Sequence, residues 1–272
     1  VKVDSSGNHQ WNGTYGGNNY DEAHSVVQTS DGGYALAGCT VIPDGPGDVM
    51  LVKVGHGSTR YPWPMFHHDP RHTGYTKSPA PNTNQTIWKY TTGDWVYSSP
   101  AVADGRVYVG SFDNKTYCLD AFTGAHIWNY TTGVAVVSSP AVADGRVYVG
   151  SYDRKVYCLD ATTGDFVWSY TTGDAVVSSP TVADGRVYVG SYDRKVYCLD
   201  ATTGAHIWNY TTGDIVFSSP AVAAGRVYFG SHDCKVYCLD ATTGDFVWSY
   251  TTGDVVYSSP AVADGMVFIG SY

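Results

Sequence analysis

Residues 168–207 read WSYTTGDAVVSSPTVADGRVYVGSYDRKVYCLDATTGAHI, and nearly the same unit recurs along most of the chain. Its tryptophan marks the period, because the copies stand 40 residues apart, at Trp88, Trp128, Trp168, Trp208 and Trp248. Repetition at a fixed period indicates one supersecondary unit that buries its apolar surface against copies of itself. The strands within this unit therefore decide the fold.

Four short strands, A to D, can be placed in the unit. Asp184-Gly185 is a strong tight-turn signal between the first two strands, and Thr202-Thr203-Gly204 separates the last two. The expected strands are Ser178–Ala183, Arg186–Ser191, Val196–Ala201 and Ala205–Tyr210. A unit of about 40 residues with four strands is typical of a propeller blade.

Both faces of the expected sheet are apolar. Strand B places Val187 and Val189 on one face and Tyr188 and Gly190 on the other. No amphipathic segment of helical length is available to cover either face. We therefore expect each blade to be covered on both sides by neighbouring blades.

The two ends of the chain look complementary. Residues 1–58 align on the same frame, with Tyr34–Gly38 as strand B, Val49–Val54 as strand C and Trp11 at the strand D position of a preceding blade. The sequence stops after a strand B, at Ser271-Tyr272. If Tyr272 aligns with Tyr152 and Val1 with Cys158, a turn of five residues (153–157) separates the two ends.

We therefore predict an all-β fold, a six-bladed β-propeller of four-stranded antiparallel blades. The N-terminal strands C and D pair with the C-terminal strands A and B and remove the open sheet edges. An open fragment of a longer array is the alternative. The single domain divides into 1–16 (strands C and D of the closing blade), 21–93 (a divergent blade with an insertion at 56–85), the near-identical blades 94–133, 134–173, 174–213 and 214–253, and 254–272 (strands A and B of the closing blade).

Composition excludes several classes of protein. The 272 residues carry a net charge of -9, which argues against a nucleic-acid binder. A hydrophobic content of 43% excludes wholesale disorder, and no apolar run reaches the length of a membrane span. The sequence begins on Val1-Lys2-Val3 without an apolar leader, so we expect any signal peptide to have been removed.

The stretch Tyr197-Cys198-Leu199-Asp200-Ala201-Thr202-Thr203-Gly204, continued to Trp208, resembles the tryptophan-docking motif of PQQ-like propeller repeats, over residues 88–272. Cysteine replaces the family's usual alanine at Cys118, Cys158, Cys198 and Cys238, and we expect these to be small buried fillers. Residues 63–81 resemble the leader before the first blade of such proteins. Residues 1–55 are similar to a second repeat type of secreted archaeal proteins.

Ligands of propellers usually bind around the central channel, on the face that carries the D-to-A and B-to-C loops. Near-identical repeats make the variable positions informative, and two such positions lie at the start of strand A. The first holds Trp95, Ala135, Ala175, Ile215 and Val255, and the second holds Tyr97, Val137, Val177, Phe217 and Tyr257. The predicted ligand-binding residues on this face are Asp21, Glu22, His24, Asp94, Trp95, Tyr97, Asp174, Asp214, Ile215, Phe217, Asp254 and Tyr257.

Glu22 and His24 are the candidate catalytic residues, because a carboxylate and an imidazole in an apolar funnel suit acid–base chemistry. The alternative is that they are solvated loop residues or pair with each other. The aspartates Asp21, Asp94, Asp174, Asp214 and Asp254 form a ring that Val134 breaks. They either attract cations such as Ca²⁺, or each accepts backbone N–H bonds in its own turn, and we favour the second interpretation.

Two further motifs have structural interpretations. The turns Asp113/Lys115, Asp153/Lys155, Asp193/Lys195 and Asp233/Lys235 are expected to be local surface pairs. His67-His68-Asp69-Pro70-Arg71-His72 contains metal-ligand residue types, but its place in the leader favours a strap over a loop face. We predict no metal site and no cofactor.

Three functions remain open. Near-identical blades favour a non-enzymatic scaffold, extracellular or at the cell surface, that binds a protein or carbohydrate ligand through the funnel. The alternative is a hydrolase or lyase at the divergent blade, using Glu22 and His24. A PQQ-dependent dehydrogenase is the least favoured, since no adjacent Cys-Cys pair occurs. The sequons at Asn12, Asn84, Asn114, Asn129 and Asn209 support an external location, and we expect a monomer.

Overall fold

The computed structural model describes residues 2–3, 9–11, 20–28, 34–41, 49–54, 63–74 and 85–272. Side chains are described for residues 25–27, 34–37, 63–74 and 85–272. In this part of the chain the regular structure consists entirely of β-strands. No helix there has the length and apolar character needed to cross a membrane.

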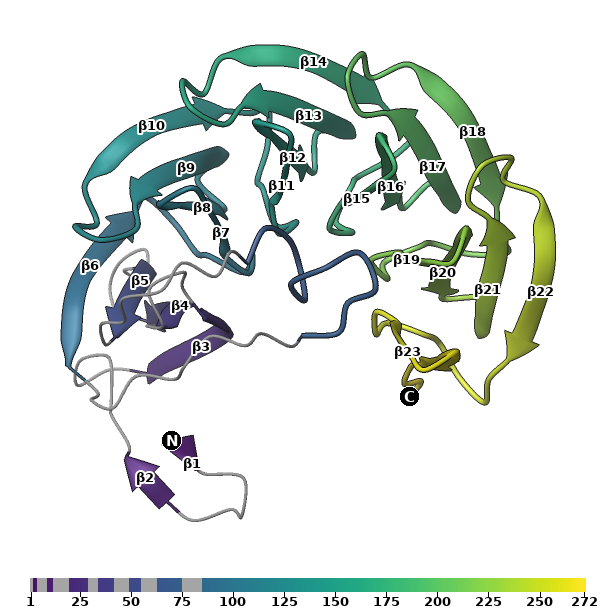
Figure 1. Cartoon of the computed structure of the whole chain (residues 1–272), viewed down its shortest axis with the longest axis horizontal. Coiled ribbons are helices and arrows are strands. Elements are labelled where there is room, and N and C mark those ends of the chain that lie inside the picture. The colour runs from purple at the N-terminus through teal and green to yellow at the C-terminus, as the bar shows by residue number, and fades with distance from the viewer. Residues whose placement is uncertain are drawn as a thin grey trace.

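Five four-stranded antiparallel sheets follow one another around an arc (Figure 1). The first contains β3 (Tyr20–Gln28), β4 (Tyr34–Val41), β5 (Val49–Val54) and β6 (Thr86–Thr92). The second sheet contains β7 (Ala101–Ala103), β8 (Arg106–Gly110), β9 (Lys115–Asp120) and β10 (His126–Thr131), and the third contains β11 (Ala141–Ala143), β12 (Arg146–Gly150), β13 (Lys155–Asp160) and β14 (Phe166–Thr171). The fourth contains β15 (Thr181–Ala183), β16 (Arg186–Gly190), β17 (Lys195–Asp200) and β18 (His206–Thr211). The fifth contains β19 (Ala221–Ala223), β20 (Arg226–Ser231), β21 (Lys235–Asp240) and β22 (Phe246–Thr251). Four-stranded antiparallel blades are thus confirmed.

The observed strands lie close to the predicted ones, except that strand A is shorter. β15 starts at Thr181, whereas the sequence suggested Ser178. Pro180 has no N–H to donate to the ladder. Ser178 instead meets strand B through its side chain, since its Oγ accepts the N–H of Gly190 at 3.0 Å. The next turn has positive φ at Asp184 (49°) and Gly185 (70°), as a two-residue hairpin turn requires.

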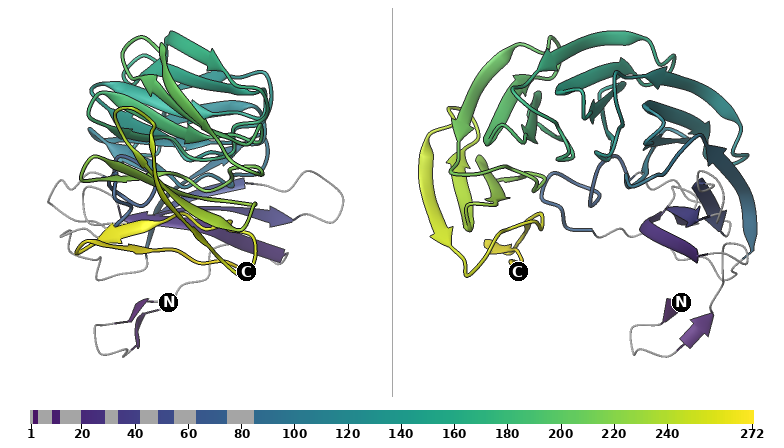
Figure 2. Two further views of the ribbon diagram at one scale, coloured as in Figure 1. Left: turned by 90° about the vertical axis from the view of Figure 1, so that its right-hand side faces the viewer. Right: turned by 180° about the vertical axis from the view of Figure 1, so that it is seen from behind.

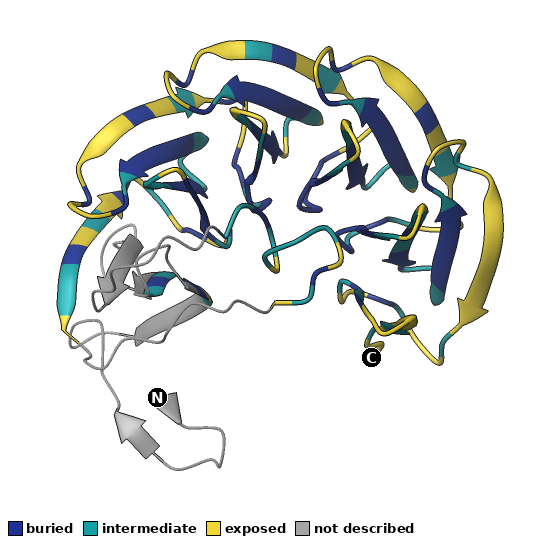
Figure 3. Cartoon of the chain, viewed as in Figure 1, coloured by how far each residue is buried: buried dark blue, intermediate teal, exposed yellow. Residues whose placement is uncertain are grey.

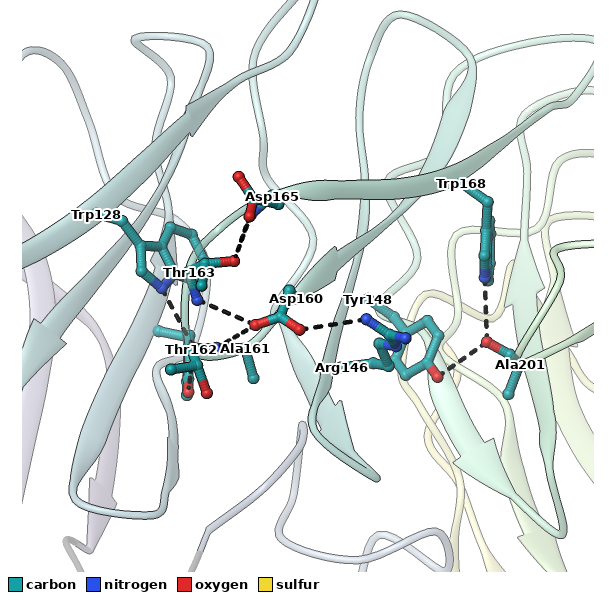
Figure 4. A network of polar contacts seen from close by, with 11 residues as sticks. Trp128, Arg146, Tyr148, Asp160, Ala161, Thr162, Thr163, Asp165, Trp168 and Ala201 are labelled. Atoms are coloured by element: carbon teal, nitrogen blue, oxygen red, sulfur yellow. Dashed lines mark hydrogen bonds and ion pairs between the residues drawn. The ribbon is translucent and has the colours of Figure 1, made fainter.

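Each blade packs on the next through its tryptophan (Figure 4). Trp128 Nε1 donates to the carbonyl of Ala161, 3.2 Å away in the following blade. Gly164 (φ 78°) lies against the same indole, so closely that a Cβ there would stand 2.6 Å from Trp128 Cδ2. Asp160 stabilises this turn by accepting the N–H groups of Thr162 and Thr163. These contacts explain why Asp and Gly stand four residues apart in the turn that receives the tryptophan of the preceding blade.

The cysteines of the repeat are buried fillers, as predicted. Cys118, Cys158, Cys198 and Cys238 are free thiols with at most 1% of their surface exposed. Burial raises the pKa of Cys158 to about 12, which leaves the thiol protonated and unreactive at neutral pH.

A relay of serines links successive blades near the centre of the arc. The N–H of Ser139 donates to Ser179 Oγ at 2.9 Å, and the N–H of Ser179 donates to Ser219 Oγ at 2.9 Å. Equivalent bonds join Ser99 to Ser139 and Ser219 to Ser259. The relay gives the second serine of the repeated Ser-Ser-Pro a structural role between blades.

The two ends of the arc carry half-blades. β1 (Lys2–Val3) pairs with β2 (His9–Trp11), and β23 (Ala261–Ala263) pairs with β24 (Met266–Phe268), each as a separate two-stranded sheet. Figures 1 and 2 show these hairpins on opposite sides of the gap in the arc. The pairing of Lys2 with Trp11 matches that of Cys158 with Trp168, so the alignment of Val1 with Cys158 was wrong by one residue.

The last complete sheet has one uncovered face (Figure 3). Trp248 in β22 is 39% exposed, whereas Trp168 is 7% exposed at the same position of its blade. Every residue of β22 is exposed. A cavity of about 470 Å³ lies here, bordered by Val236, Trp248 and Ile269 among others.

Candidate functional site

A strap of residues 63–74 runs along the inner strands at the centre of the arc (Figure 1). Its Trp63 forms an isolated antiparallel bridge with Val102 in β7, with N–O distances of 2.7 and 2.6 Å. Three later carbonyls of the strap accept N–H groups from other inner strands: Pro64 from Val142, Pro70 from Val222 and Arg71 from Val262. These bonds confirm the predicted strap and place it against the inner strands rather than over a loop face.

His72 anchors the end of the strap. It is 2% exposed, and its Nδ1 lies 3.1 Å from the carbonyl of Pro260, while its Nε2 lies 3.1 Å from Thr181 Oγ1. A carbonyl only accepts, so a neutral His72 carries its proton on Nδ1 and accepts at Nε2. Burial lowers the pKa of His72 to about 4, with a further contribution from His67. His72 is therefore neutral near pH 7.

Asp69 and His67 of the strap also have structural partners. Asp69 accepts the hydroxyl of Thr73 at 2.6 Å and the backbone N–H of Arg71 at 2.9 Å. His67 stacks on Phe66 with ring centroids 4.0 Å apart. Within the part of the chain that the structure describes, no three His, Cys, Asp or Glu side chains are arranged to hold a metal ion.

The face that carries the D-to-A and B-to-C loops gathers nine aromatic rings, which we call the aromatic cup. Five of these rings have at least 36% of their surface exposed. The cup consists of Trp95, Tyr97, Phe112, Tyr152, Tyr192, Phe217, His232, Tyr257 and Tyr272.

One half of the cup starts at the first D-to-A loop. Trp95 and Tyr97 meet edge to face with centroids 5.7 Å apart, and Tyr97 meets Phe112 at 5.3 Å. Phe112 then reaches Tyr152 of the next blade at 6.3 Å. Burial, together with a hydrogen bond between Tyr152 and Tyr192, raises the pKa of Tyr192 to about 12.

The other half continues from Tyr192 to the last described residues. Tyr192 lies 6.3 Å from Phe217, which meets Tyr257 at 5.6 Å. His232 meets Tyr257 at 4.0 Å, and burial lowers the pKa of this imidazole. The rings therefore form one continuous series, in which edge-to-face contacts orient the rings at both ends.

Sequence reasoning found four members of the cup and missed five. Trp95, Tyr97, Phe217 and Tyr257 stand at the two positions that vary between repeats. The five missed rings stand directly after the serine that begins the B-to-C turn, and they are Phe112, Tyr152, Tyr192, His232 and Tyr272. An aromatic residue stands at this position in every copy of the repeat. A comparison that looks only for differences between repeats does not single out such a position.

The described aspartates of the predicted ring serve their own turns. Asp94 Oδ1 accepts the N–H of Trp95 at 2.8 Å, and Asp174, Asp214 and Asp254 accept the next N–H at 2.7 Å. Ile215 lies in the same turn as Asp214 and is half-buried. Among the described residues, the interpretation as turn acceptors is the one that the geometry supports.

The Asp-x-Lys turns do contain local contacts, but the aspartate bonds backbone N–H groups rather than the lysine ammonium group. Asp113 accepts the backbone N–H of Lys115 at 3.2 Å, not its ammonium group. The other carboxylate oxygen accepts the N–H of Gly93 at 2.8 Å and the hydroxyl of Tyr117. The carboxylate therefore joins the B-to-C turn to the end of strand D of the preceding blade.

The positions of Asp21, Glu22 and His24 are described only as backbone. They lie within β3, where Asp21 pairs with Thr40 and Glu22 pairs with Cys39. The register shifts once between Ala23 and Ser25, at His24. The aligned segment Asp94–Tyr97 is instead a loop. Their side chains lie outside the described residues.

The blades, the central strap and the loop face define a β-propeller with a cluster of aromatic rings on its loop face. The family model described as "Outer membrane protein assembly factor BamB" matches residues 74–176, 136–220 and 196–272. These matches cover more than half of the sequence, so the chain belongs to this family. No curated protein matches it.

Solved structures show the same fold. BamB from Moraxella catarrhalis is 16% identical with a TM-score of 0.55, and the match covers 92% of this chain and 80% of that one. The quinohemoprotein alcohol dehydrogenase from Comamonas testosteroni is 22% identical with a TM-score of 0.63, covering 76% and 45%. The europium-containing methanol dehydrogenase is 19% identical with a TM-score of 0.62, covering 70% and 48%. The chain spans less than half the length of these two dehydrogenases.

Likeness to quinoproteins raises the question of whether the cup suits PQQ. PQQ is a polycarboxylate and needs basic side chains around it. The described D-to-A loops contain no Lys or Arg, and four of them carry an aspartate. The described D-to-A loops therefore do not supply the basic groups that this cofactor needs.

Proposed function

We propose that this chain is a non-enzymatic scaffold that binds a protein ligand on its aromatic cup. The observation that supports the proposal best is the exposure of Trp95 (36%), Tyr97 (37%) and Tyr257 (42%) within one continuous cluster of rings. Contiguous exposed aromatic surface is typical of interaction sites, where Trp and Tyr supply much of the binding energy. The name of the BamB family, an assembly factor, is consistent with protein binding.

We further propose that the ring closes as a sixth blade, with β1–β2 as its outer half and β23–β24 as its inner half. The pairing of Ala261 with Phe268 repeats that of Ala221 with Tyr228, so β23–β24 has the geometry of strands A and B. β1–β2 has that of strands C and D, including the register shift between Lys2 and Val3. Closure would cover Trp248.

We propose an extracellular or cell-surface location and a monomeric state. The sequon residues Asn129 and Asn209 are exposed on the outer strands β10 and β18, where a glycan has room. The family description names the outer membrane, which is compatible with this location.

A peptide library and a glycan array, screened in parallel with hydrolase substrates, would test the proposed function. We expect peptide ligands whose binding is lost in Tyr97→Ala and Tyr257→Ala and kept in Asp184→Asn, which changes a turn at the opposite end of the blades. Binding of glycans alone would replace the protein ligand with a carbohydrate. Turnover that disappears in Glu22→Gln or His24→Ala would replace the scaffold with the enzyme alternative.

A further inference from the structure

We infer, on the basis of the proposed function, that the cup recognises the lysine and arginine side chains of an extended basic peptide. The faces of aromatic rings carry negative electrostatic potential, and ammonium and guanidinium groups bind over them. Trp95 and Tyr97 lie at one end of the cup and Tyr257 and Tyr272 at the other, and all four rings are exposed. Trp and Tyr are the aromatic residues that hold cations best.

Carboxylates stand close to these rings in the sequence, in the same D-to-A loops. Asp94 directly precedes Trp95, and Asp254 stands three residues before Tyr257. In each case Oδ1 accepts one backbone N–H, which fixes the carboxylate in its turn. No described residue bonds Oδ2 of Asp94 or Asp254, so this oxygen is available to a cationic ligand.

The basic residues of this face belong to the B-to-C turns, such as Arg154 and Lys155. The carbonyl of Arg154 accepts the N–H and hydroxyl of Thr172 at the end of strand D, away from the inner strands. Lys155 Nζ lies 5.9 Å from the ring of Tyr157, which is not part of the cup. The described D-to-A loops thus carry aspartates and aromatic rings and no Lys or Arg, while the basic residues of this face belong to the B-to-C turns.

This distribution favours a cationic peptide over a neutral carbohydrate. Both ligands can stack on aromatic rings, but only the cation gains from the carboxylates in the same loops. A partly exposed pair of this kind is screened by salt, so binding of the peptide should weaken as ionic strength rises. Stacking of a neutral sugar should change little.

The experiment uses hexa-arginine and cellohexaose as probes in isothermal titration calorimetry. Asn at positions 94 and 254 keeps an oxygen for the turn bond and removes the charge, so Asp94→Asn/Asp254→Asn should fold normally. Its matched control is Asp104→Asn/Asp184→Asn, which removes the same charge from hairpin turns at the other end of the blades. Both control positions have φ of 49°, which Asn adopts readily.

We expect hexa-arginine to bind about tenfold more weakly to the first double variant than to the control, from about 1.4 kcal/mol of lost interaction. Equal binding to both variants would overturn the inference, because the attraction would then follow net charge alone. Binding of cellohexaose but not hexa-arginine would also overturn it and leave a binding scaffold in place. Binding of neither probe, together with no hit in the peptide and glycan screens, would contradict the proposed function itself.

Discussion

The Nε2 atom of His72 lies 3.1 Å from Thr181 Oγ1, and this contact accounts for the one repeat in which threonine replaces alanine. The other repeats have alanine at this position: Ala101, Ala141, Ala221 and Ala261. The same hydroxyl lies 2.6 Å from the carbonyl of Pro220. One hydroxyl hydrogen is thus shared between two acceptors. The strap and a single repeat are thus matched to each other within a series of otherwise nearly identical repeats.

Removal of this hydroxyl should destabilise the fold. In Thr181→Ala the buried Nε2 of His72 loses its donor, and leaving such a group unsatisfied costs about 1–3 kcal/mol. Urea unfolding should show this decrease in the free energy of unfolding, while Thr181→Ser, which keeps the hydroxyl, should stay near wild type. If the alanine and serine variants were equally stable, the contact would have no energetic importance.

The fold should lose stability as the pH falls from about 6.5 to about 4. The pKa of His72 is about 4 when folded and about 6.5 when unfolded, so the unfolded chain binds the extra proton within this window. The difference corresponds to about 3 kcal/mol. Burial also lowers the pKa of His67, which acts in the same direction.

Urea unfolding at several pH values checks this, with His72→Gln as the comparison. The variant should lose most of the slope between pH 6.5 and 4, although its stability at pH 7 falls as well. Hydrogen bonds lower the pKa of aspartates such as Asp160, so these groups change the stability of the fold only at lower pH. Their effect should be the same in the wild type and in His72→Gln. An unchanged slope in the variant would show that His72 is not the group responsible.

Two glycines with similar dihedral angles should differ in their tolerance of alanine. Gly145 has φ of 71°, and a Cβ added there would meet no atom within 4 Å, so Gly145→Ala should cost only the backbone strain of about 1–2 kcal/mol. Gly164 has φ of 78°, but its Cβ would lie 2.6 Å from Trp128 Cδ2. Gly164→Ala should therefore cost clearly more, as measured by the midpoint of thermal unfolding. Equal losses would contradict the packing of this turn on the indole.

The repeat made the blades predictable, because each strand has its own turn signals and four copies repeat them. The strap's partners were not predictable in this way. Its contacts with Val102, Val142 and Val222 use backbone groups, which any sequence supplies. The aromatic rings of the B-to-C turns were not recognised as members of the cup, because they occur in every repeat. Thr181 was visible as a difference between repeats, but only the position of His72 explains it.

The pairing register of β1 with β2 was also not predictable from the sequence. Val1-Lys2-Val3 aligned naturally with Cys158-Leu159-Asp160, which put Val1 opposite Trp11. The structure pairs Lys2 with Trp11, as it pairs Lys53 with Trp88 in the first sheet. The divergent repeats thus carry lysine where the other repeats carry cysteine, and simple alignment by residue type cannot show this.

The cup reaches the open end of the arc at Tyr257 and Tyr272, whose ring centroids are 5.2 Å apart. The proposed closure of the ring would therefore place the sixth blade next to this end of the cup. The register of the complete blades pairs Tyr148 with Cys158, which corresponds to Phe268 and Lys2 in the closing blade. The most direct test is disulfide formation in Lys2→Cys/Phe268→Cys, made in a Cys234→Ser background to remove the most accessible of the described thiols. The comparison variant Val1→Cys/Phe268→Cys has the register that the sequence alignment suggested.

On oxidation of the monomer at low concentration, mass spectrometry of tryptic peptides should find the intramolecular 2–268 bond in most of the protein and little 1–268 bond. Burial of Trp248 should accompany closure and shift its fluorescence to the blue. Absence of the 2–268 bond in folded monomer, or its formation only between two chains, would contradict a ring closed by its own termini.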